Sequence, residues 1–239
     1  KYMAIVANQT ALASDFVSES AGTADQSKVP KLNPSGKLDA SFFKGPIVRV
    51  YTANATWTKP SSLVAVLVEC QAAGGGGGSS NTTANGQGGG GAAGTWARMF
   101  TLAAVLTSTV AITVGIGGTA GSASAGGNGG LSSFGAYISC PGGNGGSRGI
   151  AGAGGGSGGE ATGTGVDLSV PGQAGEIGTS IAGNTMGRGG DAMLGRGGVT
   201  GGGDSGGGSA TGYGSGGGGG RNASGEQDGA AGKGGVIIV

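Results

Sequence analysis

The stretch PGGNGGSRGIAGAGGGSGG (residues 141–159) has a glycine at every third position from Gly143 to Gly158. The chain holds 64 glycines in 239 residues, and glycine dominates residues 142–235. Such a segment is by default a flexible linker, because glycine loses the most backbone freedom on folding and adds no side chain to a core. The unbroken period instead favours helices of the polyproline II type, which have three residues per turn and no internal hydrogen bonds. Their backbone N–H and C=O groups remain available to neighbouring segments.

Collagen and disorder are the alternatives for a chain so rich in glycine. Collagen requires a strict Gly-X-Y register and abundant proline, whereas this register breaks at Ala161 and the chain has only 6 prolines. Disorder stays open as an alternative on composition. We expect residues 142–235 to form polyglycine II helices that pack side by side, with hardly any α-helix.

Runs of apolar and β-branched residues frame the glycine-rich region. Residues 63–69 are nearly all apolar, and residues 47–51 and 95–102 alternate between apolar and polar types. These patterns predict β-strands, and further strands are expected at residues 110–116, 135–140 and 236–239. The predicted fold is therefore all-β, a small β-sheet framework from which a large glycine-rich insertion extends.

Residues 1–46 have an ordinary composition and are expected to form an extended N-terminal arm. The arm has too few apolar neighbours in its own chain to bury its larger side chains, which are Ile5, Leu12, Phe16, Val29, Leu32, Phe42 and Phe43. We therefore expect an attachment and oligomerisation segment at residues 1–46 and a glycine-rich tip domain at residues 47–239. Because the sequence starts at Lys1, we expect a fragment or a processed product of a longer chain.

Composition argues against several classes of function. The chain has 13 basic and 12 acidic residues, so it lacks the excess of positive charge that would favour binding to nucleic acid or to an acidic membrane. No apolar run is long enough for a transmembrane helix. There is no histidine and no Cys-x-x-Cys pair, so we expect no metal site and no cofactor. Without a nucleophile–base constellation or paired carboxylates, we expect that the protein is not an enzyme.

The two cysteines, Cys70 and Cys140, both lie in strand patterns. Free cysteine in such positions usually behaves as a small buried hydrophobe, and this is the expected state. A disulfide between the two strands is the alternative.

Five separated blocks resemble the glycine-rich domain of bacteriophage tail fibres: TWTKP (56–60) with the strand at 64–68, AAGGGGG (72–78), AITVGIGG (111–118), SSFG (132–135) and GGVIIV (234–239). The resemblance extends over residues 48–239, and residues 22–43 resemble the linker upstream of fibre tips. It implies a host-recognition tip on the virion, in some members a polyglycine II sandwich with variable surface loops. It also implies a homotrimer whose N-terminal arm joins other tail or fibre proteins. No receptor-contact residue can be carried over, because those loops vary.

Side chains that interrupt the glycine rows are the candidate receptor contacts, namely Met186, Met193, Leu194 and Tyr213. Tyrosine and methionine are favoured at binding surfaces, although these four residues are equally able to fill gaps in the sandwich or between subunits. The predicted function is attachment without catalysis to a bacterial surface glycan or outer-membrane protein, through turns at the far end of the insertion. The alternatives are a purely structural virion protein, such as a capsid fibre or tail spacer, and a glycine-rich cell-surface or RNA-associated protein.

Overall fold

The computed structural model describes residues 16–17, 29–30, 45–82, 86–149, 154–156, 158–178, 187–199, 205–222 and 224–239. The chain divides into two units, Lys1–Ile47 and Val48–Val239. In the first unit, β1 (Phe16–Val17) and β2 (Val29–Pro30) pair in parallel. The rest of the expected N-terminal arm up to residue 44 lies outside the described residues, as does Met186.

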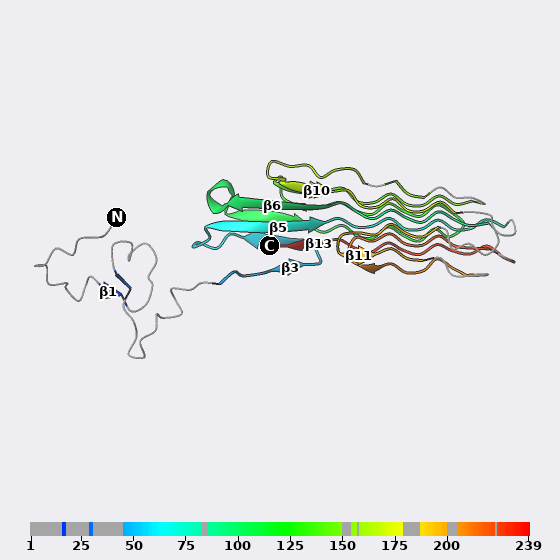
Figure 1. Ribbon diagram of the computed structural model, residues 1–239, viewed down its shortest axis with the longest axis horizontal. Helices are drawn as coiled ribbons and strands as arrows, with labels where there is room; N and C mark the ends of the chain where they lie inside the picture. Colours follow the sequence, from blue (N-terminus) through cyan, green and yellow to red (C-terminus); the bar gives the residue numbers. More distant parts are fainter. Residues whose placement is uncertain are drawn as a thin grey trace, which may run out of the picture. The chain divides into compact units, whose positions relative to one another are not determined.

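Two antiparallel sheets form the framework of the second unit (Figure 1). The first sheet contains, in order, β10 (Leu168–Val170), β6 (Trp96–Leu102), β5 (Ala65–Gln71), β13 (Val236–Ile238) and β3 (Val50–Tyr51). The second sheet contains β4 (Ala55–Thr58), β7 (Thr109–Thr113), β8 (Ser132–Phe134) and β9 (Ile138–Cys140).

Two small elements complete the described part of this unit. The strands β11 (Gly195–Arg196) and β12 (Thr211–Gly212) form a separate antiparallel pair, and the 3-10 helix η4 (Ala103–Val105) follows β6. The described residues contain no α-helix, and the fold is nearly all β, as the alternating sequence runs predict. Within these ranges, no helix has the length and apolar character that crossing a membrane requires.

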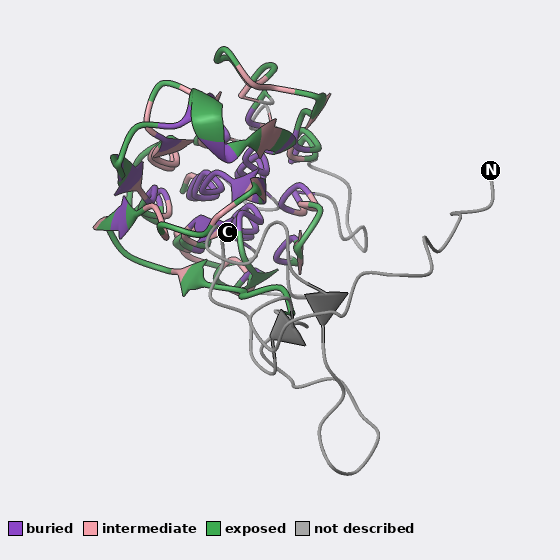
Figure 2. Cartoon of the chain, turned by 90° about the vertical axis from the view of Figure 1, so that its left-hand side faces the viewer, coloured by how far each residue is buried: buried purple, intermediate pink, exposed green. Residues whose placement is uncertain are grey.

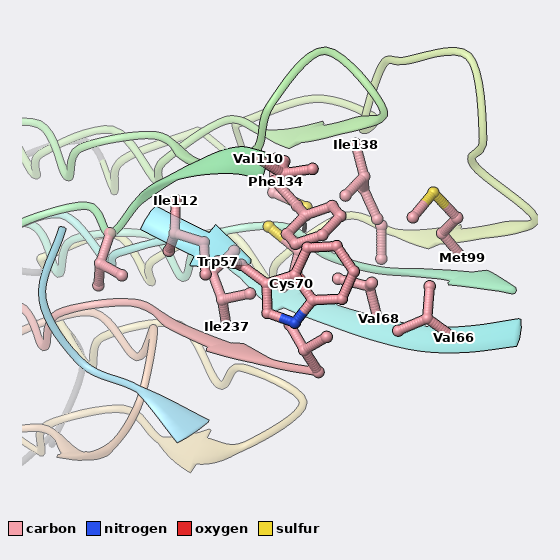
Figure 3. Close-up of a cluster of buried hydrophobic side chains, with 14 of the residues drawn as sticks. Trp57, Val66, Val68, Cys70, Met99, Val110, Ile112, Phe134, Ile138 and Ile237 are labelled. Atoms are coloured by element: carbon pink, nitrogen blue, oxygen red, sulfur yellow. Dashed lines mark hydrogen bonds between the residues drawn. The ribbon is translucent and has the colours of Figure 1, made fainter. Parts of the chain in front are cut away.

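The facing sides of the two sheets enclose one hydrophobic core (Figure 3). Successive residues of a strand point to opposite faces, so Val66, Val68 and Cys70 of β5 all enter this core. The rings of Trp57 (β4) and Phe134 (β8) meet edge to face with centroids 5.3 Å apart. The core therefore joins the two sheets into one framework.

Both cysteines are free and buried in this core, as expected. The thiol of Cys70 donates a hydrogen bond to the carbonyl of Ser132 at 3.3 Å, and the thiol of Cys140 donates to the carbonyl of Cys70 at 3.3 Å. The hydrogen bond with the Cys140 side chain, followed by burial, raises the pKa of the Cys70 thiol. A thiol that stays protonated is a poor nucleophile, so Cys70 has a packing role.

Beyond the sheets, the chain continues as extended segments that run side by side (Figure 1), and we call these segments rows. The row at residues 72–80, which continues β5, shows how they are joined. Its N–H groups donate in rotation to three neighbouring rows: Gly74 to Lys233, Gly75 to Ala92, Gly76 to Gly127, then Gly77 to Ala230, Gly78 to Gly89 and Ser79 to Ser124. The rotation repeats every three residues, so a single row is bonded on several sides.

The carbonyl groups of the same row accept hydrogen bonds from three further rows. The donors are Gly118 and Gly121 from one row, Gly143, Gly146 and Gly149 from the second, and Gly217 and Gly220 from the third. The rows that donate hydrogen bonds to residues 72–80 run parallel to it, whereas the rows that accept hydrogen bonds from it run antiparallel to it. This row therefore has hydrogen-bonded neighbours on all sides, and its backbone polar groups are satisfied although it is buried.

Burial separates central rows from peripheral rows (Figure 2). Residues 72–80, 88–95 and 214–222 are buried throughout and are the central rows. They contain the glycine runs 74–78, 88–91 and 216–220. A Cβ atom added at Gly76 would lie 1.9 Å from the carbonyl oxygen of Thr119, so only glycine allows this approach. Consecutive glycines thus mark rows that are packed on every side.

The peripheral row at residues 142–149 follows a different rule. Gly143 and Gly146 are buried, whereas Asn144 and Ser147, which also recur every third residue, are exposed. A row with neighbours on only part of its circumference leaves one position per turn free for a side chain. The three-residue period that is most regular in the sequence therefore begins in the outer layer of the bundle and not in its centre.

Candidate functional site

The end of the bundle away from the sheets closes on a layer of polar side chains. Each central row meets this layer where its glycine run stops: Ser79 and Ser80 follow residues 74–78, Gln87 precedes residues 88–91, and Arg221 and Asn222 follow residues 216–220. All five side chains are buried, and we call them the polar cap. A row that ends needs partners for its last backbone groups, and polar side chains can supply them.

Hydroxyl groups of the cap hold two turns against the bundle. Ser79 Oγ accepts a hydrogen bond from the N–H of Ser124 at 3.0 Å and donates to the carbonyl of Ser124 at 3.1 Å. Ser80 Oγ accepts from the N–H of Gln227 at 2.8 Å. Asn222 donates to the carbonyl of Asn81 and accepts from the N–H of Gly225 at 2.7 Å. The serine and asparagine side chains of the cap thus hold the backbones of these turns against the ends of the rows.

An ion pair and a strained residue shape the same end. Arg148 Nη2 lies 2.8 Å from Glu226 Oε1, which ties a peripheral row to the turn before residues 227–235. Ala123 has a φ of +49°, a conformation that L-residues other than glycine rarely adopt. It stands at the apex of the turn at residues 121–126, where residues 122–125 are exposed. The exposed residues 122–125 of this turn are all serine or alanine, and their hydroxyl and backbone groups can exchange hydrogen bonds with a hydroxyl-rich or peptide ligand.

Three of the predicted contact residues lie at the other end of the bundle. Met193 and Leu194 form the apex of a tight turn, in which Ala192 and Gly195 exchange backbone hydrogen bonds of 2.8 and 3.3 Å. Tyr213 follows β12, whose Gly212 pairs with Gly195 of β11, so the register brings Leu194 and Tyr213 to the same end of this ladder.

The neighbour of Tyr213 shows which end this is. A Cβ atom at Gly214 would lie 2.4 Å from Nε2 of Gln71, the last residue of β5. The structure therefore groups Met193, Leu194 and Tyr213 as exposed residues beside the first sheet (Figure 1 labels β11 there), and not at the far turns where the sequence argument expected the contacts.

Charged side chains brace this turn. Asp191 forms an ion pair with Arg188, and its Oδ1 accepts a hydrogen bond from the N–H of Gly197 at 2.7 Å. Partial burial by itself would raise the pKa of Asp191, but the Gly197 N–H, the Arg188 guanidinium and the charge of Arg196 outweigh it and lower the pKa. Asp191 is therefore ionised at neutral pH and has a positioning role.

Sequence reasoning missed the polar cap, although a signal for it exists. Each of the three central glycine runs is bordered at its far end by serine, glutamine, arginine or asparagine. Within the ranges that the structure describes, no group of His, Cys, Asp or Glu side chains has the arrangement of a metal site. The candidate site that the geometry offers is therefore the capped far end with its exposed turns, together with the separate Met193–Leu194–Tyr213 cluster.

Comparison with protein families identifies a glycine-rich domain. The sequence profile described as "Glycine-rich domain" matches residues 50–239, which include the second unit from β3 to the C-terminal residue. No curated protein matches the chain.

Proposed function

The chain belongs to the glycine-rich domain family, and we propose that it is a phage fibre or spike tip protein that attaches the virion to a receptor on the bacterial surface without catalysis. Membership in the family does not by itself specify a function. The observation that carries the proposal is the polar cap, where hydrogen-bonded rows end in exposed turns. Turns held on a stiff scaffold can vary in sequence without disturbing it, and host recognition demands such variation.

We also propose that the rows are polyglycine II helices. The support is the rotation of hydrogen-bond donors at residues 74–79, which returns to the same neighbouring row every three residues. A polyproline II helix has three residues per turn and directs its backbone groups outward. In this view the glycine-rich part is a bundle of such helices that extends from the β-framework. An extended N-terminal fibre arm precedes this domain in the sequence.

The proposed partners follow from the same view. The receptor is a bacterial surface glycan or an outer-membrane protein, and the protein acts in the virion as a homotrimer. Its N-terminal arm joins other tail or fibre proteins. We propose no nucleic-acid partner, no membrane insertion, no cofactor and no catalytic step, because the chain has a net charge of +1 and no histidine.

Adsorption of the purified chain to bacterial cells tests the proposed site. Ser122 and Ala125 are exposed in the described far turn. The double change Ser122→Arg and Ala125→Arg places two large charged groups there, and we expect adsorption to cells that bind the wild-type protein to fall at least tenfold. The reason is that an interface tolerates neither bulk nor unpaired charge in its centre.

The matched variant changes the other candidate cluster, with serine in place of Met193, Leu194 and Tyr213. A loss of adsorption in this triple variant alone would move the receptor site to the sheet end. Unchanged adsorption in both variants, with circular dichroism equal to that of the wild type, would contradict both candidate sites. Failure of the wild-type protein to adsorb to any bacterial strain would contradict the proposed function.

A further inference from the structure

One face of the first sheet is left uncovered by the described chain. The inner face packs on the second sheet, whereas the outer face carries exposed apolar side chains from β6, β5, β10 and β3: Phe100, Leu102, Leu67, Leu168, Val170 and Val50. Phe100 is 60% exposed and pairs with Leu67 in the part of the sheet beyond the ends of β10 and β13. Monomeric proteins rarely expose contiguous apolar surface of this kind.

The strand register places these residues opposite one another on adjacent strands, and we call each set of opposed residues a level. Leu67 of β5 lies opposite Phe100 of β6, and Ala65 lies opposite Leu102 in the next level. The level on the other side of Leu67 holds Glu69 and Arg98, which also lie opposite each other. The outer face thus combines apolar levels with one level that contains both a carboxylate and a guanidinium.

The charged level has no partner that explains it. Among the described residues, neither Glu69 nor Arg98 takes part in an ion pair, although the two stand in register on adjacent strands. The two ion pairs that the described residues form, Arg148–Glu226 and Arg188–Asp191, lie in the glycine bundle. A face with opposite charges at one level can be complementary to a second copy of itself.

The glycine bundle limits how far this face extends. The row at residues 214–222 forms hydrogen bonds with the row that leads into β6 and with the row that leads into β13. The turn before it, at Gly212–Gly214, lies against the side chain of Gln71 on the outer side of β5. The outer layer of the bundle therefore stops where the sheet begins, and the sheet face beyond it is left open.

We infer that copies of this chain associate in parallel through the outer face of the first sheet, around an axis that runs along β5 and β6. Rotation about such an axis keeps every residue at its own height. Glu69 of one copy then meets Arg98 of the next, and the Leu67–Phe100 levels meet one another. A parallel arrangement also directs all capped ends the same way, as an attachment tip requires. The inference rests on the proposed homotrimer and gives it an interface.

The mass of the full chain in solution tests this interface. We expect light scattering to give three times the chain mass of 22.0 kDa for the wild type and a single chain mass for Phe100→Lys. The control is Ile116→Lys, at a residue that is 83% exposed in a peripheral row, and it is expected to keep the wild-type mass. Circular dichroism must be unchanged in both variants, which separates loss of association from loss of fold.

Charge reversal tests the same contact without relying on an apolar change. Glu69→Arg alone places like charges at one level and is expected to weaken association at least tenfold, whereas the double change Glu69→Arg and Arg98→Glu is expected to restore it. A wild-type trimer that persists in Phe100→Lys would overturn this interface and leave the homotrimer intact. A wild-type single chain would overturn both, while adsorption by that single chain would leave the proposed attachment intact.

Discussion

Replacement of Gly76 by alanine is expected to lower the free energy of unfolding by about 3 to 5 kcal/mol. The added Cβ would lie 1.9 Å from the carbonyl oxygen of Thr119 and 2.6 Å from its carbon, and both are backbone atoms that cannot move alone. Overpacking of this kind costs about 1–3 kcal/mol. The shift also strains the hydrogen bonds from Gly76 to Gly127 and from Gly146 to Gly76, each 2.9 Å long and worth about 1 kcal/mol.

Gly206→Ala is the matched control for this prediction. Its Cβ would meet no atom closer than the carbonyl oxygen of Asp228 at 3.5 Å. Alanine restricts the unfolded chain, so at a compatible position it leaves stability equal or raises it by about 0.4–1 kcal/mol. Denaturant unfolding followed by circular dichroism measures both variants. Equal stability of Gly76→Ala and Gly206→Ala would contradict the close approach of the rows.

Phe134→Ala is expected to lower the free energy of unfolding by about 3–5 kcal/mol. Phe134 is fully buried and contacts both Trp57 and Tyr137, with ring centroids 5.3 and 6.1 Å away. Its removal leaves a cavity between the two sheets that the surrounding strands cannot fill. The near-ultraviolet circular dichroism of Trp57 should weaken in the same variant, because its aromatic partner is lost.

Ile116→Ala serves as the control, since Ile116 is exposed and should cost less than about 0.5 kcal/mol. If Phe134→Ala unfolds at the same denaturant concentration as Ile116→Ala, then the two sheets do not share the core that joins them.

The long strands of the framework were predictable, and so were the short strands β3, β9 and β13, whereas other short strands were not. The apolar run at residues 63–69 and the alternation at residues 95–102 correspond to β5 (Ala65–Gln71) and β6 (Trp96–Leu102). In contrast, β10 (Leu168–Val170) has three residues and no pattern of its own. It forms because it pairs with β6. Pairing between segments that are far apart in the chain cannot be predicted from a short stretch of sequence.

The glycine pattern held more information than its period alone. The regular spacing begins in the peripheral row at residues 142–149, because a row with an exposed side chain at every third position shows the period most clearly. The central rows carry uninterrupted glycine and therefore show no period at all. A run of consecutive glycines indicates a row that is surrounded by other rows, whereas a glycine at every third position indicates a row with neighbours on only some of its sides.

The residues that interrupt the glycine rows could be read from the sequence, but the end of the bundle at which they lie could not. Met193, Leu194 and Tyr213 interrupt the glycine rows as expected, yet a glycine-rich chain turns at both ends of every row. The sequence around Met193, Leu194 and Tyr213 does not show at which end their turns lie, whereas polar residues do border the far ends of the central glycine runs. In the structure, hydrogen bonds between the side chains of Ser79, Ser80 and Asn222 and the far turns identify that end.

Amide hydrogen exchange tests most directly the claim that the glycine-rich part is a packed, hydrogen-bonded bundle. Buried amides in a cooperative core exchange only through large openings, so peptides that contain residues 74–78, 88–91 and 216–220 are expected to retain deuterium-exchangeable protons for hours at neutral pH. The exposed turn at residues 122–125 should exchange within the first minute and serves as the internal reference. Complete exchange of the three glycine runs at the rate of that turn would contradict the account.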